Sequence, residues 1–178
     1  MTKAEIRKQK LKERKNVTER DKKDKKIISR LIQQDFYEKA KTIMTYISYN
    51  GEVDTKELIK KMLLDKKTLC APKCVTECDI KAMSFCDFSE LSVGAYGILE
   101  PSGKEITDID LIIVPGVAFS ERLHRIGYGA GYYDRFLEKN SAVTVGLFYE
   151  MQKADFKEDT KDLALDYIIT EENIYKKG

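Results

Sequence analysis

The segment DLIIVPG, residues 110–116, restricts the possible folds of this chain more than any other feature. It contains four consecutive apolar side chains, so a strand formed there would need cover on both of its faces. Pro115 and Gly116 would end the strand at once. A strand buried on both faces belongs inside a parallel sheet with helices on each side, so this segment predicts an α/β protein.

The rest of the chain alternates between helix and strand patterns, as such a sheet requires. Helices are expected over residues 2–15, 18–40, 54–65 and 132–139. Thr18 is expected to cap the second helix. Strands are expected over 42–48, 68–74, 79–86, 110–116, 142–148 and 166–170, and a loop over 94–101. The sequence thus predicts a single domain over residues 1–178, a three-layer α/β/α fold with a mostly parallel central sheet, on which the N-terminal helices of residues 1–40 pack.

The charges are unevenly distributed along the chain. The net charge is only +2, but residues 1–30 hold 13 Lys and Arg against 5 Asp and Glu. Such a basic arm can contact phosphates, although most of these lysines fit a solvated helix face. No segment has the length and hydropathy of a membrane span, and the first fifteen residues lack the apolar stretch of a signal peptide. We therefore expect a cytoplasmic monomer with no membrane or nucleic-acid partner.

The four cysteines lie within seventeen residues of one another, at positions 70, 74, 78 and 86. Their spacing differs from the paired cysteines of zinc sites, and the only histidine, His124, is distant in sequence. In a cytoplasmic chain this pattern predicts reduced thiols in or beside buried strands.

The segment RIGYGAGYYDR, residues 125–135, is the main candidate for a binding site. Gly127, Gly129 and Gly131 permit positive φ and leave backbone N–H groups free to converge on an anion. The segment follows the most buried strand and precedes a helix, which is where open parallel sheets bind ligands, and phosphate is the ligand we expect. It is neither a Walker A loop nor a GxGxxG fingerprint. The glycine spacing alone fits a tight turn packed on the sheet equally well.

The neighbours of the glycines favour a nucleotide. Arg125 and Arg135 can bind phosphate oxygens, and Asp134 is the kind of oxygen ligand that Mg²⁺ takes beside a nucleotide. Flat faces for a planar ring system are offered by three aromatic residues, Tyr128, Tyr132 and Tyr133, of which at least one is expected only to pack at the helix start.

The longer run PGVAFSERLHRIGYGAGYYDR, residues 115–135, resembles the signature of the 5-formyltetrahydrofolate cyclo-ligase family. Four further segments resemble that family in the same order: KAEIR (3–7), YNGEVDT (49–55), YGILEP (96–101) and DLALDYIITEEN (162–173). The resemblance implies an ATP- and Mg²⁺-dependent closure of 5-formyltetrahydrofolate, with or without a polyglutamate tail, to 5,10-methenyltetrahydrofolate. ADP and phosphate would be released through a phosphorylated formyl intermediate.

The resemblance also implies roles for individual residues. Lys3, Arg125 and Asp134 would be catalytic, and Asp134 and Asp162 would hold Mg²⁺. The folate would contact Ile47, Glu52, Tyr128 and Tyr132. ATP would bind along two segments, namely Lys3, Ala4, Glu5, Ile6 and Arg7, and then Arg125, Ile126, Gly127, Tyr128, Gly129, Ala130, Gly131, Tyr132 and Tyr133. Ala130 departs from the family, which usually has Gly or Lys there.

Two other functions fit parts of the sequence. One is a different ATP-using α/β enzyme, in which the glycine segment holds a nucleotide beside another substrate. The other is a noncatalytic nucleic-acid-binding module that uses the basic first thirty residues. The second leaves Glu52, Asp134 and the tyrosines without a role.

Overall fold

Seven strands form the central sheet of the computed structural model, which describes residues 1–178. They are β1 (Thr42–Met44), β2 (Thr68–Cys74), β3 (Ile80–Phe85), β6 (Leu111–Val114), β9 (Val143–Leu147), β10 (Tyr167–Ile169) and β11 (Ile174–Lys176). Their order across the sheet is β11-β10-β9-β6-β1-β2-β3. The inner pairs are parallel, and only the edge strands β3 and β11 run antiparallel to their neighbours. The predicted mostly parallel sheet is therefore confirmed.

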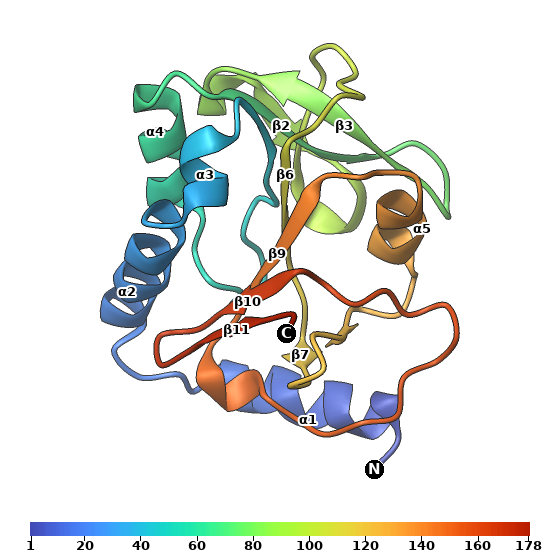
Figure 1. The fold of residues 1–178 in the computed structure, drawn as a ribbon. Helices are drawn as coiled ribbons and strands as arrows, with labels where there is room; N and C mark the ends of the chain where they lie inside the picture. The colour runs from blue at the N-terminus through green and yellow to red at the C-terminus, as the bar shows by residue number, and fades with distance from the viewer.

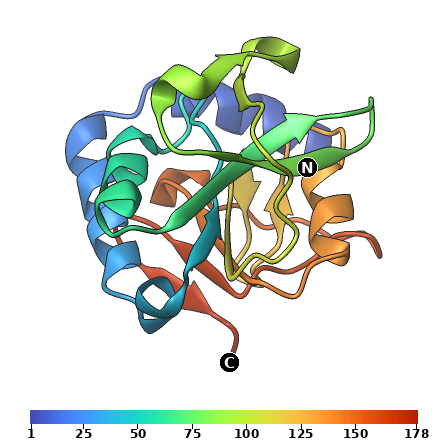
Figure 2. The same ribbon diagram turned by 90° about the horizontal axis from the view of Figure 1, so that it is seen from above.

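Five helices surround the sheet: α1 (Lys3–Arg14), α2 (Arg20–Ile32), α3 (Asp35–Lys39), α4 (Lys56–Leu64) and α5 (Tyr132–Glu138). Seen from above, α2, α3 and α4 cover one face and α5 covers the other (Figure 2). Helix α1 lies across the edge where β6 ends (Figure 1). None of the helices combines the length and hydropathy needed to cross a membrane.

Two hairpins and three short 3₁₀ turns lie outside the central sheet. The hairpins pair β4 (Leu91–Val93) with β5 (Leu99–Pro101), and β7 (Ala118–Phe119) with β8 (Arg125–Ile126). The 3₁₀ turns are η1 (Phe88–Glu90), η2 (Ala95–Gly97) and η3 (Glu150–Gln152).

Strand β6 explains why the sheet needs helices on both faces. Leu111 and Ile113 belong to the larger buried cluster, which includes residues of α2, α3 and α4. Ile112 and Val114 point the other way, into a second cluster with Leu137 of α5. All four side chains of the strand are fully buried, as its unbroken apolar run predicted.

Helix α1 is fixed at both its start and its apolar side. Thr2 and Glu5 form a reciprocal capping box that satisfies backbone donors of the first turn. One turn later Ile6 packs into a third small cluster with Ala118 and Ile126 of the β7–β8 hairpin and with Phe156. The helix is thereby seated on the hairpin that follows β6.

The helix expected over residues 18–40 is wrong in two respects. The chain divides it into α2 and α3, because Gln34 adopts an extended conformation between them. This bend brings the Phe36 ring to 4.5 Å from the Tyr167 ring and lets the Tyr37 hydroxyl donate to Asp65. Thr18 is not the cap, because the helix begins after Glu19, whose backbone is left-handed. No Gly or Pro marks the bend, so helical spacing alone could not locate it.

Other boundaries differ because small paired elements carry little apolar periodicity. The strand expected over 42–48 ends at Met44, and the residues after it form the first loop of the site. The loop expected over 94–101 contains η2 and β5, and β11 and the β7–β8 hairpin were not anticipated. The four cysteines form no disulfide. Cys70 is buried, Cys74 half-buried, and Cys78 and Cys86 are exposed.

Two leucines on α4 provide a matched test of this packing. Leu58 is fully buried in the larger cluster, whereas Leu64 is 79% exposed on the same helix. We expect Leu58→Ala to lower the free energy of unfolding by roughly 2–5 kcal/mol because it leaves a cavity. Leu64→Ala should change it by less than about 0.5 kcal/mol. Urea denaturation measures both, and equal losses would contradict the placement of α4.

Candidate active site

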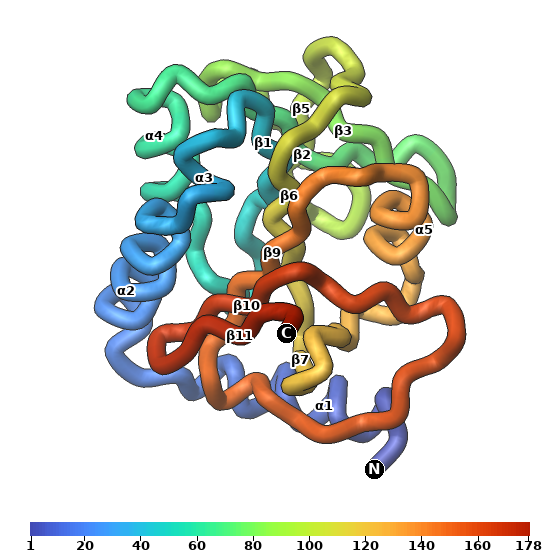
Figure 3. Tube along the Cα trace, viewed as in Figure 1, coloured from blue at the N-terminus to red at the C-terminus, as the bar shows by residue number.

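The candidate site lies at the carboxyl ends of β1, β6 and β9. The loops that follow these strands, residues 45–55, 115–131 and 148–152, meet on the side of the sheet next to α1, which lies at the bottom of the view in Figure 3. Cationic side chains of α1 donate hydrogen bonds to backbone oxygens of all three loops: Asn50 in the first, Gly116 and Gly127 in the second, and Met151 in the third. This is the edge of a parallel sheet at which ligands bind, so the expected location of the glycine segment is confirmed.

Two of the three glycines in the segment need the freedom of glycine. Gly129 has φ of +108° and Gly131, at the start of α5, has φ of +71°. A Cβ at Gly129 would lie 3.7 Å from the Arg7 guanidinium, and one at Gly131 would lie 2.9 Å from Arg135. The Arg7 Nε donates to the Gly127 oxygen at 2.7 Å. The structure thus brings together the two predicted nucleotide-binding segments.

Lys3 and Asp162, predicted for different roles, are direct partners. Lys3 Nζ contacts the carboxylates of Asp159, at 2.7 Å, and Asp162. Burial lowers the pKa of Lys3, but the two carboxylates outweigh it and raise the pKa overall. Burial raises the pKa of Asp162, but Lys3 and the Asp159 backbone N–H lower it overall. Both groups are therefore charged at neutral pH.

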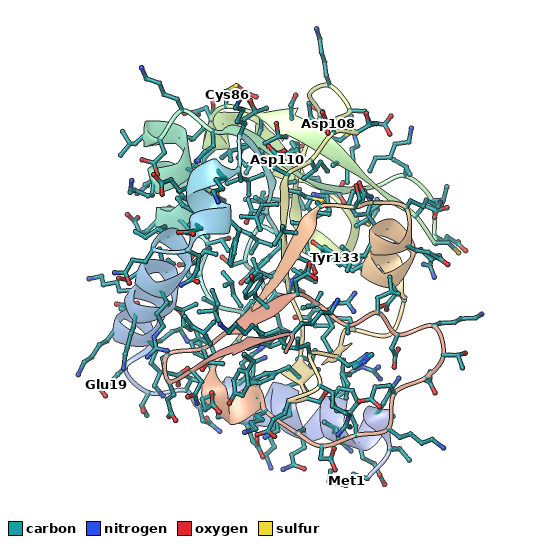
Figure 4. The ribbon with its side chains drawn as sticks, in the orientation of Figure 1. Met1, Glu19, Cys86, Asp108, Asp110 and Tyr133 are labelled. Atoms are coloured by element: carbon teal, nitrogen blue, oxygen red, sulfur yellow. The ribbon has the colours of Figure 1, made fainter.

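Arg125 and Asp134 form a second ion pair across the glycine segment. Arg125 NH1 lies 2.9 Å from Asp134 Oδ1, and the arginine side chain is only 4% exposed. Its guanidinium also lies 5.9 Å from the centre of the Tyr133 ring. Tyr133, between α5 and the sheet in Figure 4, has a buried hydroxyl with no hydrogen-bond partner. A buried hydroxyl without a partner carries a free-energy cost that a ligand could offset.

The two carboxylates predicted to hold Mg²⁺ do not form a ready-made metal cage. Asp134 and Asp162 each contact a cation, and no group of three or more His, Cys, Asp or Glu side chains gathers anywhere in the protein. Mg²⁺ beside a nucleotide usually takes only one or two carboxylates, with phosphate oxygens and water completing its shell. The residues present therefore fit a metal that arrives with a nucleotide.

Glu52 lies on the opposite side of the site, in the loop after β1. One of its carboxylate oxygens accepts from the Tyr128 hydroxyl at 3.1 Å, and the other from the Tyr49 backbone N–H at 2.9 Å. Burial raises the pKa of Glu52 to about 7, against the opposing effects of the Tyr49 N–H, the Arg14 charge and Tyr128. A carboxyl whose pKa is shifted toward neutral pH by burial is a candidate functional residue.

The tyrosines of the segment have different surroundings. The Tyr132 hydroxyl lies 3.2 Å from the Tyr96 hydroxyl, and their rings meet edge to face at 6.4 Å. Tyr96 is 65% exposed, so this pair borders solvent. Tyr128 is linked to Glu52, whereas Tyr133 packs inward. Ile47 is half-buried against the larger cluster.

Several residues of the predicted nucleotide-binding ranges support the fold through their side chains. Ile6 and Ile126 are buried in one cluster, and Glu5 belongs to the capping box. Ala4 and Ala130 are exposed. Arg135, a candidate for binding phosphate, donates hydrogen bonds to two backbone oxygens, those of Cys78 and Ala130. Because the side chains of Ile6 and Ile126 are buried, only the backbone atoms of these two residues could contact a ligand.

Sequence reasoning missed Arg14, which the structure places at the centre of the site. It is fully buried and donates to the Gly116 and Asn50 oxygens and to the Tyr128 hydroxyl. Lys3, Arg7, Lys10 and Arg14 follow one another at intervals of four, three and four residues, which places them on one helix face. This spacing was the only sequence feature that could have pointed to Arg14, but the same spacing also fits a helix face exposed to solvent.

The chain belongs to the 5-formyltetrahydrofolate cyclo-ligase family, whose model matches residues 1–171. It is therefore an enzyme of the ligase class. A probable 5-formyltetrahydrofolate cyclo-ligase of Schizosaccharomyces pombe is 30% identical, over 84% of each chain. The NMR structure of Aquifex aeolicus 5,10-methenyltetrahydrofolate synthetase is 35% identical, with a TM-score of 0.88 over 99% of this chain and 93% of that one.

A 5,10-methenyltetrahydrofolate synthetase from Mycoplasma pneumoniae is also similar in structure. It is 26% identical and has a TM-score of 0.82, over 96% of this chain and 99% of its own. The family resemblance expected from the sequence motifs is thereby confirmed, together with the fold.

The titration of Glu52 predicts how a substitution alters stability with pH. The pKa of Glu52 rises from 4.5 to about 7 on folding, because the folded protein favours the neutral carboxyl. The contribution of this carboxyl to the free energy of unfolding is therefore greatest below pH 4.5 and is lost as the pH rises through 7. Glu52→Gln cannot ionise, so its free energy of unfolding should exceed that of the wild type at pH 8.

Urea denaturation at pH 5 and pH 8 measures this advantage, which should grow with pH. Glu77→Gln, at an exposed carboxyl, is the control and should show no such growth. An advantage of Glu52→Gln that is equal at the two pH values would contradict the raised pKa.

Proposed function

We propose that this enzyme closes 5-formyltetrahydrofolate to 5,10-methenyltetrahydrofolate while ATP is split to ADP and phosphate. Family membership supports the folate conversion. The observation that carries the rest is the meeting of α1 with the glycine segment through Arg7, because it joins the two segments in which the family motifs place ATP. Glu52 lies across the same edge, where the folate would bind.

The reaction needs alignment and charge neutralisation more than covalent chemistry by the protein. The formyl oxygen is a weak nucleophile, so it must be held in line with the terminal phosphorus of ATP. Its attack forms an O–P bond and breaks the bond to ADP. The N10 amine then attacks the activated formyl carbon, the C–O bond breaks, and phosphate leaves as N10 loses its proton.

The cations of the site are suited to the triphosphate. Arg7 contacts the glycine segment, Arg125 begins it, and Lys3 lies one helical turn before Arg7, beside Asp162. The exposed backbone around Gly129 can approach phosphate oxygens closely. We infer that these groups hold the phosphates. Mg²⁺, held by Asp134 and Asp162 with the phosphates, would neutralise charge that develops on the transferred group.

The other side of the site is suited to the folate. An ionised Glu52 can accept two N–H donors from the edge of the pterin ring, a bidentate arrangement that suits a carboxylate. The faces of Tyr132 and Tyr128 offer stacking surfaces, and Ile47 would add apolar contact. We further propose that the enzyme acts as a monomer in the cytoplasm, on folate with or without a polyglutamate tail.

The direct test is the absorbance of the methenyl product. Protein mixed with ATP, Mg²⁺ and 5-formyltetrahydrofolate should raise that absorbance with time, and omission of ATP should abolish the rise. Thermal shifts with ATP–Mg²⁺, NAD and 5-formyltetrahydrofolate separate the alternatives. Stabilisation by NAD, or by ATP–Mg²⁺ without any effect of the folate, would argue for a different α/β enzyme.

The Arg125–Asp134 ion pair should be essential for turnover. Arg125→Ala and Asp134→Ala remove a phosphate-binding charge and the proposed metal ligand, so each should lower kcat by roughly 100-fold or more. Asp134→Asn keeps the side-chain volume and should show the same loss. Tyr132→Ala should chiefly raise the KM for folate.

The control for these variants is Asp108→Ala, which removes an exposed carboxyl at the opposite edge of the sheet (Figure 4). It should keep wild-type rates. Wild-type turnover by Arg125→Ala and Asp134→Ala would refute the assignment of the site. Circular dichroism checks that each variant is folded.

A further inference from the structure

Arg14 is an unusual residue because its charge is buried without an acidic partner. Its side chain is fully buried, and none of the ion pairs of the protein includes it. Its three hydrogen bonds, at 2.7–3.0 Å, go to neutral oxygens, and its Nε has no partner. Burying a cation in this way is costly unless a nearby negative charge compensates it.

The nearest negative charge in the hydrogen-bond network is Glu52. Arg14 NH2 donates to the Tyr128 hydroxyl at 2.7 Å, and this hydroxyl donates to Glu52 at 3.1 Å. The Arg14 guanidinium also lies 5.9 Å from the centre of the Tyr128 ring. Two hydrogen bonds through the Tyr128 hydroxyl therefore link the buried guanidinium of Arg14 to the carboxylate of Glu52.

The same arginine also holds the turn that precedes Glu52. Arg14 NH2 donates to the Asn50 oxygen, and Arg20 NH1 donates to the Gly51 oxygen, both at 2.7 Å. A Cβ at Gly51 would lie 3.6–3.7 Å from atoms of both guanidinium groups, and its φ of +77° suits glycine. Arg20 NH2 donates in turn to the Arg14 backbone oxygen. The turn is thus enclosed by two arginines.

We propose that Arg14 is a positioning residue of the folate site, which holds Tyr128 and the Asn50–Gly51 turn in place on two sides of Glu52. This inference rests on the proposed function, in which Glu52 accepts the N–H donors of the pterin ring. Arg14 does not touch the folate in this scheme. It acts through the two groups that fix the position of the carboxylate.

The charge of Arg14 has a second effect, on the ionisation of Glu52. Burial raises the pKa of Glu52, and the charge of Arg14 is among the influences that lower it. The other groups that face the carboxyl are the Tyr49 N–H, Tyr128, and the hydroxyls of Tyr46 and Tyr133. None of these is a second cation. Removal of the Arg14 charge should therefore raise the pKa of Glu52 and lower the fraction of Glu52 that is ionised, and able to bind the pterin, at neutral pH.

The test compares Arg14→Met with Arg14→Lys by steady-state kinetics. For Arg14→Met we expect the KM for 5-formyltetrahydrofolate to rise roughly 10-fold or more, as for a lost hydrogen bond to a charged group, with the KM for ATP changed less than about 2-fold. In the wild type, kcat/KM for the folate should rise with pH as Glu52 ionises. In Arg14→Met, the midpoint of this rise should lie at a higher pH than in the wild type. Arg14→Lys keeps the charge, so its midpoint should match that of the wild type. Its KM for the folate should lie between those of the wild type and Arg14→Met, because lysine cannot replace all the hydrogen bonds of arginine.

Two further variants keep the inference falsifiable if Arg14→Met does not fold. Tyr128→Phe cuts the hydrogen-bond link to Glu52 while keeping the ring, so it should move the folate KM and the pH midpoint in the same direction. Lys12→Met is the matched control. Lys12 is exposed on the same helix and lies outside the face that meets the loops of the site, so its loss should leave both unchanged.

The outcomes separate this inference from the proposed function. Failure of the wild-type protein to form the methenyl product would refute the proposed function and the inference with it. Wild-type turnover, together with an unchanged folate KM and pH midpoint in Arg14→Met and Tyr128→Phe, would overturn the inference alone. So would a loss of kcat in Arg14→Met with an unmoved midpoint, because a merely structural residue gives that result.

Discussion

Four cations on one face of α1 hold the carboxyl edge of the sheet together. Lys3 binds two carboxylates of the 159–162 segment, and Arg7 and Lys10 each bind a loop carbonyl. Arg14 binds three oxygens from two loops, residues 45–55 and 115–131. Parallel strands leave irregular loops at this edge, and the oxygens of those loops need donors. A single helix supplies them at four positions, so the arrangement of the site depends on where α1 is seated.

The order of these cations along α1 matches a division of the site into two halves. Arg7, in the first half of the helix, reaches the glycine segment, and Lys3, one turn before it, reaches Asp162. Arg14, at the end of the helix, reaches the turn beside Glu52. The nucleotide and the folate of the proposed reaction would therefore be aligned by one rigid element. Alignment of two substrates is the main contribution that such a phosphoryl transfer requires from a protein.

Glu52 and Tyr133 show that the site is not optimised for the stability of the empty protein. A carboxyl whose pKa is raised to about 7 by burial and a buried hydroxyl with no partner both cost free energy on folding. Elsewhere the fold obeys the usual rules, with apolar strands buried and the start of α1 closed by a capping box. Such local exceptions are expected where ligands bind.

The sequence alone determined the features that depend on neighbouring residues. The apolar run of β6 required cover on two faces, and Gly129 and Gly131 provide positive φ where no other residue fits easily. The family motifs likewise identified the segments of the candidate site, because several short patterns in one order are specific.

Only the tertiary structure decided which charged residues would be buried. Helical spacing places Arg14 on a face with Lys3, Arg7 and Lys10, but it cannot say whether that face meets water or protein. Arg14 is buried because loops from residues 50, 116 and 128 converge on it. The bend at Gln34 likewise depends on contacts with Tyr167 and Asp65, which are distant in sequence. Periodicity along a chain records which side chains share a face, whereas the partner of that face depends on segments far away in sequence.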